Sequence, residues 1–208
     1  AIQRFGFEGT PGPVQSLSFL DPAQIAPQSI SLAMLENGPD AFVAAVQPQT
    51  NQVRLAAFFV NGALEIPWPT NPWPLNNPNA RTAIAVGPDH YIFVAAENQL
   101  RVFNAALSEL GAFTLPSTVS SLAVNQDGIW VILPEENRVL RSPRLVTLDQ
   151  ALQPPAWQDV TLPAGARPIS LAKDPASGML VLDPHRVLIF NAQGQPVSTW
   201  TGLDNLTF

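Results

Sequence analysis

The hydrophobic positions of this chain fall into short runs that are separated by turns rich in Gly, Pro, Asp and Asn. The apolar run Ala83–Val86 precedes the turn Gly87-Pro88-Asp89, and a second apolar run, Ile92–Ala95, follows it. A similar pair of runs, Ser121–Val124 and Ile129–Ile132, flanks a turn that contains Asp and Gly. Runs of this length with Gly and Pro between them are typical of β-strands joined by tight turns. The pattern therefore predicts an all-β chain.

The paired runs recur along the chain, and each pair is followed by a third run that resembles Leu-Arg-Val-Phe-Asn. The first strands are centred on Leu32, Ile84, Leu122 and Leu171, with Leu206 as a fifth candidate. Intervals of about 35 to 50 residues between short strands predict a β-propeller, here with five blades. We expect a single domain, 1–208, with blade cores near 28–66, 79–113, 118–148 and 166–200, and a fifth built from 203–208 with 1–20.

Both ends of the chain are expected to contribute to the fifth blade. Ala1–Gly9 resembles the third strand of the other blades, and Leu203–Phe208 resembles a first strand. Closing the last blade with both termini pairs strands that would otherwise leave exposed sheet edges. The short final interval predicts that this blade lacks its second strand or that the parent chain continues beyond Phe208.

The composition narrows the classes of function. The net charge of −6 disfavours nucleic acid, which needs a basic face. The absence of cysteine excludes disulfides, thiolate metal sites and cysteine nucleophiles. No run reaches the roughly 18 apolar residues of a membrane helix. Scarce lysine, 22 prolines and abundant Gln and Asn favour an exported bacterial protein, so we expect an extracytoplasmic location, in the cell envelope or secreted.

The repeat resembles the NHL type and related small bacterial propellers. Ser121–Val131 and Val187–Gly194 carry the shared pattern best, and the resemblance covers most of the chain. It implies a propeller fold, and the class includes protein-interaction modules, cell-surface proteins and some hydrolases or lyases. The aspartate that commonly follows the second strand is present as Asp183, whereas two matching positions read Ala95-Ala96-Glu97 and Leu133-Pro134-Glu135. These departures leave the subfamily open.

A proline-rich insertion, Pro67–Asn79, carries two tryptophans. Proline makes such a segment stiff and extended, and rigid exposed aromatic side chains are common anchors of interfaces. We predict that a protein or glycan partner binds here, through Trp68, Trp73, Pro69 and Pro72. The alternative is that both tryptophans fold back and pack on the adjacent blade.

Two histidines, each beside a carboxylate, are candidate metal ligands: His90 with Asp89, and His185 with Asp183. Their turns are expected on opposite faces of a propeller, which disfavours one shared site. Copper or zinc on either histidine would allow redox chemistry, such as superoxide removal, or metal-assisted hydrolysis. The alternative is that both are ordinary turn residues.

The mouth of the central channel is the usual small-molecule site of a propeller. The residues expected there directly precede the first strands: Ser29, Arg81, Ser120, Ile169 and Asp204. Of these, Arg81 and Asp204 could form an ion pair. The Glu, Asn and Asp cluster of a Ca²⁺-dependent lactonase is not recognisable, and no G-x-S-x-G motif occurs. The sequence thus favours a non-catalytic propeller that binds an envelope protein or glycan, within a larger complex; the alternative is the copper or zinc enzyme.

Overall fold

The computed structural model describes residues 2–5, 11–15, 30–34, 41–47, 50–58, 73–77, 79–143, 152, 154–174 and 178–202. This part of the chain holds antiparallel sheets, one 3₁₀ turn, η2 (Pro134–Glu136), and no α-helix. The strands are β1 (Ile2–Phe5), β2 (Pro11–Gln15), β3 (Ile30–Met34), β4 (Ala41–Gln47), β5 (Gln52–Phe58), β6 (Thr82–Val86), β7 (Ile92–Ala96), β8 (Gln99–Phe103), β9 (Glu109–Thr114), β10 (Ser121–Val124), β11 (Gly128–Leu133), β12 (Arg138–Pro143), β13 (Gln158–Asp159), β14 (Ser170–Asp174), β15 (Gly178–Asp183), β16 (Arg186–Phe190) and β17 (Pro196–Thr201).

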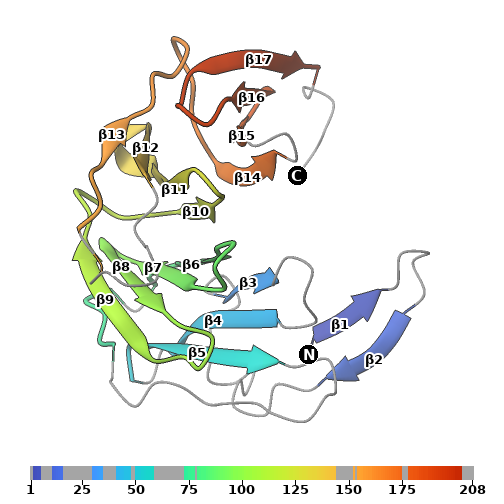
Figure 1. Cartoon of the computed structure of the whole chain (residues 1–208), viewed down its shortest axis with the longest axis vertical. Coiled ribbons are helices and arrows are strands. Elements are labelled where there is room, and N and C mark those ends of the chain that lie inside the picture. The colour runs from blue at the N-terminus through green and yellow to red at the C-terminus, as the bar shows by residue number, and fades with distance from the viewer. Residues whose placement is uncertain are drawn as a thin grey trace.

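The strands form five sheets within these residues, and each sheet is a meander in which neighbours in sequence are neighbours in space. The sheets are β1-β2, β3-β4-β5, β6-β7-β8-β9, β10-β11-β12-β13 and β14-β15-β16-β17. Figure 1 shows them following one another along an arc in chain order, with β1–β2 and β14–β17 at its two ends. The sheet β10-β11-β12-β13 includes an outer strand, β13, that lies beyond position 148.

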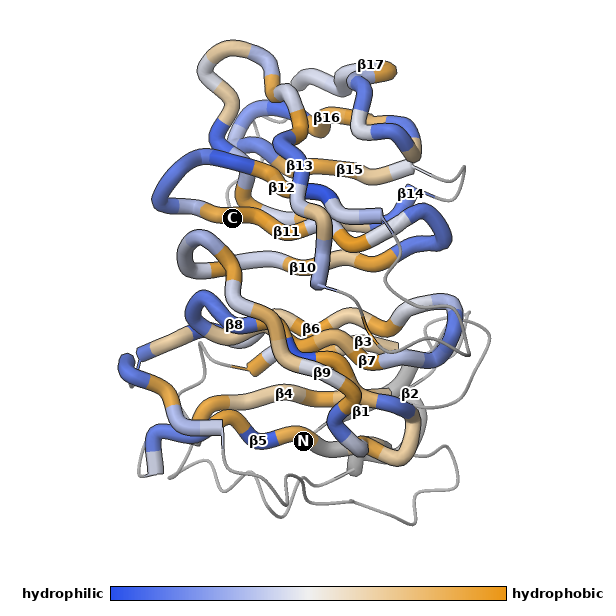
Figure 2. The backbone as a smooth tube through the Cα atoms, turned by 60° about the vertical axis from the view of Figure 1, so that its left-hand side comes forward, coloured by the Kyte–Doolittle hydropathy of each residue, from blue (hydrophilic) through white to orange (hydrophobic). Residues whose placement is uncertain are grey.

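The first strand of each larger sheet lies on the inner side of the arc. Contacts run from β3 to β6, from β6 to β10 and from β10 to β14. The second strands β4, β7 and β11 are buried on both faces over the residues whose side chains are described, because a neighbouring sheet can cover each face. Figure 2 shows that the residues of these strands are mostly hydrophobic (orange), whereas many of the turns between them are hydrophilic (blue).

Three hydrophobic cores lie between successive sheets, and one pairing recurs in each. A small residue on the inner strand stands opposite an aromatic residue on the second strand; the pairs are Ala33–Phe42, Ala85–Phe93 and Ala123–Trp130. The inner strands of neighbouring sheets approach closely, so small side chains fit there, and aromatic rings fill the wider space outside them. In the last sheet the matching pair is Ala172–Leu180.

Candidate functional site

The inner strands are tied together at their starting ends by the hydroxyl groups of Ser31, Thr82 and Ser121. Ser31 Oγ lies 3.0 Å from Thr82 Oγ1, and the Thr82 hydroxyl also donates to the Ala44 carbonyl oxygen at 3.2 Å. Ser121 Oγ accepts a hydrogen bond from the Leu171 amide at 3.0 Å. These links align the inner strands in one direction, so the centre of the arc has a rim where they start and an opposite rim where they end.

The starting rim carries three of the residues predicted at the channel mouth. Arg81 is exposed before β6, Ser120 is half-buried before β10, and Ile169 is 50% exposed before β14. The amides of Ser120 and Ile169 donate to the second strands of their own sheets, at Ile132 O and Leu182 O. These bonds hold both residues at the rim, where an apolar side chain and a guanidinium face solvent.

Two residues predicted at the same rim, Ser29 and Asp204, lie outside the described residues. The ion pair between Arg81 and Asp204 therefore stays a prediction. Within the described residues the Ser120 hydroxyl oxygen is buried and has no hydrogen-bond partner.

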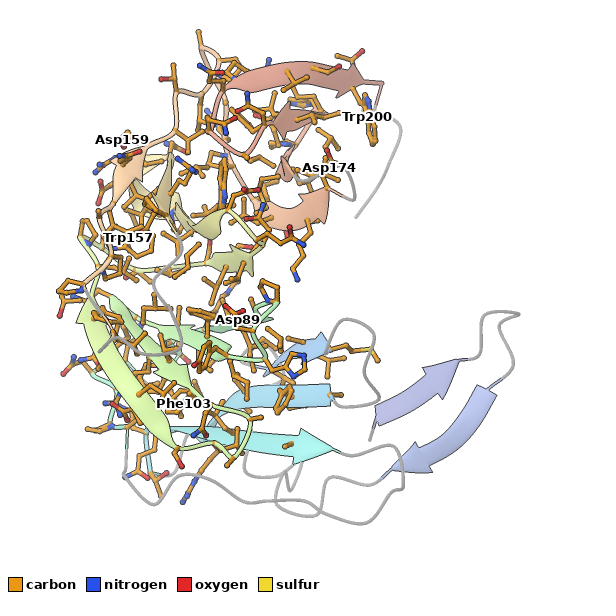
Figure 3. The ribbon with its side chains drawn as sticks, viewed as in Figure 1. Asp89, Phe103, Trp157, Asp159, Asp174 and Trp200 are labelled. Atoms are coloured by element: carbon orange, nitrogen blue, oxygen red, sulfur yellow. The ribbon has the colours of Figure 1, made fainter. Side chains whose placement is uncertain are left out.

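The ending rim is held by the single lysine of the sequence. Lys173 Nζ donates to the Val86 carbonyl oxygen at 3.2 Å and so joins the end of β14 to the end of β6. Asn125 Nδ2 donates to the Gly178 carbonyl oxygen at 3.2 Å, which joins the β10–β11 turn to the last sheet. Figure 3 labels Asp89 and Asp174, which belong to the turn after β6 and to the end of β14 at this rim.

The two histidines lie at opposite rims, because His90 follows the end of β6 and His185 lies in the β15–β16 turn beside the start of β14. His90 is exposed, has φ +63°, and its amide donates to the Gly87 carbonyl oxygen at 3.0 Å. His185 is also exposed, and its amide donates to Asp183 Oδ1 at 3.2 Å. The structure does not bring the two imidazoles together.

The carboxylate of Asp183 is 3% exposed and serves the backbone around it. Its Oδ2 accepts from the Arg167 amide at 2.8 Å, and Arg186 Nε lies 3.7 Å from its Oδ1. Such bonds to backbone N–H groups fix the turn in which His185 lies. In the described part of the chain no three His, Cys, Asp or Glu side chains gather in one place. Metal binding at His90 with Asp89, or at His185 with Asp183, stays a prediction.

Trp73 lies in the core rather than on the surface, with its side chain 1% exposed. Its carbonyl oxygen accepts from the Val53 amide at 3.1 Å, and the Leu75 amide donates to the Asn51 carbonyl oxygen at 2.8 Å. These bonds place the backbone of Trp73 along the outer edge of β5. The Arg101 guanidinium lies 4.5 Å from the centre of the Trp73 ring, so the ring is covered on that face by a cation.

The packing alternative therefore describes Trp73. The other three residues of the predicted binding segment, Trp68, Pro69 and Pro72, lie outside the described residues. Their role in partner binding stays a prediction.

An exposed apolar stripe on β3 is a feature that the sequence reading missed. Ile30, Leu32 and Met34 are 47%, 51% and 52% exposed and point to one face of the strand, since side chains alternate between faces. We call these three residues the inner stripe. The period-two alternation with Ser31 and Ala33 signals it, whereas the residues that match Leu32 in the next two repeats, Ile84 and Leu122, are buried.

The charged groups with the clearest pairing lie away from both rims, on the outer strands β12 and β13. Arg138 donates twice to Asp159, from Nε at 2.8 Å and from Nη2 at 3.0 Å. Arg138 also pairs with Glu136. These hydrogen bonds hold the pKa of Asp159 below its ordinary value and raise the pKa of Arg138. The cluster stabilises the outer edge and contributes no group to the centre.

Comparisons with known proteins bear on the fold. No family model matches the chain, and no curated protein matches it. Kuenenia stuttgartiensis hydrazine synthase is similar in structure, with a TM-score of 0.59 and 12% identity, over 90% of this chain and 51% of that one. The extracellular domain assigned to a hybrid two-component system of Bacteroides thetaiotaomicron has a TM-score of 0.57 and 8% sequence identity, and the match covers 98% of this chain and 26% of that one. A chain of a nidogen–laminin complex has a TM-score of 0.53 and 10% sequence identity, and the match covers 82% of this chain and 62% of that one.

These similarities, together with the arc of antiparallel sheets, show an all-β, propeller-like fold. The chain spans between about a quarter and three-fifths of the lengths of these three neighbours. Within the described residues, none of the elements is a helix with the length and apolar character needed to cross a bilayer.

Proposed function

We propose that this protein is a non-catalytic, extracytoplasmic β-propeller that binds a partner at the cell envelope. In this proposal the ring has five blades, and the fifth is built from both termini. The observation that carries the binding function is the inner stripe of Ile30, Leu32 and Met34. Exposed contiguous apolar side chains commonly mark interaction sites.

The central residue of the stripe is open, whereas the matching residues of the next two inner strands are covered. Ile84 and Leu122 stand where Leu32 stands in the repeat, and they are only 8% and 7% exposed. Leu32 is 51% exposed. Ile84 and Leu122 are covered by the sheet that precedes their own, whereas Leu32 is open on that side. In this proposal the partner contacts the part of the stripe that the closing blade leaves uncovered.

The chemistry of the stripe favours a protein over a glycan. Its members are aliphatic, and aliphatic side chains match the apolar core of a protein interface. Sugar rings stack on aromatic side chains, and Trp68 remains the predicted residue for that alternative. The extracellular domain and the nidogen–laminin complex among the similar structures support an extracytoplasmic, protein-binding propeller.

The experiment compares the capture of envelope proteins by the wild type, Leu32→Asp and Leu110→Asp. Leu110 lies on the outer strand β9 and is 40% exposed, so it is a matched apolar surface position away from the stripe. We expect Leu32→Asp to lose a discrete partner and Leu110→Asp to retain it. Both variants should keep their stability within about 0.5 kcal/mol, because both positions face solvent. Equal capture by all three proteins would refute the proposal.

The copper or zinc enzyme is tested separately by elemental analysis of native, unchelated protein. About one copper or zinc per chain, lost in His90→Ala or His185→Ala, would favour that alternative.

A further inference from the structure

The outer strand of the last sheet, β17, is an open sheet edge. All six residues of Pro196–Thr201 are exposed, and Val197 and Trp200 are 63% and 57% exposed. Within the described residues β17 pairs only with β16. The N–H and C=O groups that point away from β16 therefore face solvent, and such a row of unpaired donors and acceptors is a template for another strand.

The chain covers another outer edge itself, and that contact shows which kind of segment fits. The Val53 amide of β5 donates to the Trp73 carbonyl oxygen at 3.1 Å, and the Leu75 amide donates to the Asn51 carbonyl oxygen at 2.8 Å. An antiparallel bridge joins the same two segments. A short extended segment from elsewhere in the sequence thus adds to the sheet β3-β4-β5 through its backbone.

Two further outer strands are protected by length, charge or cover. β13 has only two residues, one of which is Asp159. β9 carries Glu109, which forms an ion pair with Arg101, and the Leu152 side chain packs beside the backbone of Gly111. Short length, charge and cover all discourage edge pairing.

The sequence of β17 has none of these protections after its first residue. It reads Pro-Val-Ser-Thr-Trp-Thr and contains no charged residue. Val, Thr and Trp, which make up most of it, are residue types that pair well across strands. The strand is therefore both open and suited to accept a neighbour.

We propose that an extended segment of a partner protein adds to the outer edge of β17 as a further strand of its sheet, in the way that Trp73–Leu75 adds to β5. The hydrogen bonds come from the two backbones, and alternate side chains of the segment contact β17. Figure 1 shows β17 at the outer side of its sheet and β14 at the inner side. This surface is therefore separate from the inner stripe and goes beyond the proposed function.

A second copy of the chain fits the edge less well than an extended segment does. Pairing β17 with itself joins one strand of six residues on each side. A stable interface uses about 20–30 residues and about 800 Å² on each partner. An extended peptide needs only the open edge, because its main chain supplies most of the contact.

The test uses a displayed library of random peptides as the probe and the full chain as the target. Peptides selected on the wild type are then compared on Thr199→Lys and Ala112→Lys. Thr199 and Ala112 are exposed at matching places of β17 and β9, opposite Leu188 and Arg101. We expect the selected peptides to lose at least about fivefold in affinity for Thr199→Lys, because lysine on an edge hinders pairing, and to keep their affinity for Ala112→Lys.

Two readouts identify strand addition rather than another contact. Peptide binding should slow hydrogen exchange of amides in Pro196–Thr201 and leave exchange in Glu109–Thr114 unchanged. N-methylation at alternate residues of the peptide should abolish binding, and N-methylation at the residues between them should not, because only one edge of a strand faces its neighbour.

Three results would overturn the proposal. The library could yield no peptide that distinguishes the wild type from Thr199→Lys, the protected amides could lie outside β17, or sedimentation could show a dimer that Thr199→Lys dissociates, which would make a second copy the occupant. Circular dichroism checks that both variants fold, and Thr201→Lys replaces Thr199→Lys if that variant does not. Leu32→Asp should bind the selected peptides as the wild type does, so failure here leaves the Leu32 result standing, and the reverse also holds.

Discussion

Replacing Trp73 is the sharpest test of where the proline-rich insertion packs. The ring is 1% exposed, lies under the Arg101 guanidinium and borders the first core. A buried tryptophan removes about 150–250 Å² from water, which at about 25 cal/mol per Å² gives an upper bound of roughly 4–6 kcal/mol. A cation over the ring adds about 0.5–2 kcal/mol. Measured truncations of buried tryptophan cost about 3–5 kcal/mol, so we expect Trp73→Ala to fall in that range.

The indole nitrogen of Trp73 refines the prediction. It is buried and has no hydrogen-bond partner among the described residues. A buried donor without a partner costs about 1–3 kcal/mol, and phenylalanine lacks that donor. Trp73→Phe should therefore cost only about 1–2 kcal/mol, since the lost ring area is offset by removal of the unpaired N–H.

The assay is urea unfolding followed by far-ultraviolet circular dichroism, with the thermal midpoint as a second readout. At about 2–4 °C per kcal/mol for a chain of this size, Trp73→Ala should lower the midpoint by about 10 °C. Leu110→Ala is the exposed control. A loss below about 1 kcal/mol for Trp73→Ala would refute the reasoning, because it would mean that the ring faces solvent as a binding anchor does.

Two further predictions concern the sheets themselves. A Cβ at Gly178 would lie 2.2 Å from the Phe190 carbonyl oxygen, so Gly178→Ala should cost at least about 2 kcal/mol. A Cβ at Gly111 meets side chains rather than backbone, Leu152 at 3.1 Å and Phe113 at 3.4 Å, so Gly111→Ala should cost much less, and equal losses in urea unfolding would contradict this. Asp159→Asn should cost less than about 1 kcal/mol at neutral pH, because the Asp159 side chain is 63% exposed. The pKa of Asp159 is lowered in the folded protein, so its contribution is present above the unfolded pKa and is lost as the pH falls through the folded pKa. Unfolding curves of variant and wild type should therefore converge in acid, and a difference that grows in acid would show the opposite sign.

The strand pattern was predictable because it depends on local chemistry. The pair Ala83–Val86 and Ile92–Ala95 with its Gly-Pro-Asp turn appears in the structure as β6 and β7 within one residue at each end. Burial of second strands on both faces produces uninterrupted apolar runs, and such runs are visible in sequence. The propeller-like order of the sheets followed from their repetition along the chain.

The candidate sites were harder to predict, because they depend on which positions remain uncovered. Trp73 belongs to the proline-rich insertion, yet its carbonyl oxygen accepts from the Val53 amide of β5, the Leu75 amide donates to Asn51 just before β5, and the Trp73 side chain is buried in the core. Leu32 carries the same residue type as Leu122 at the same repeat position, but only one of the two is covered. Exposure of that kind is set by the neighbouring sheet, and no residue of the strand itself encodes it.

The most direct test of the binding function places a photo-activatable amino acid at position 32 of the full chain. Irradiation in the native envelope should give one discrete adduct at position 32, and introducing Met34→Asp into the same chain should remove it, because Met34 lies on the same exposed stripe. The same amino acid at position 110 should give no such adduct. An identical adduct from both positions, or none from position 32, would contradict a partner bound at the inner stripe.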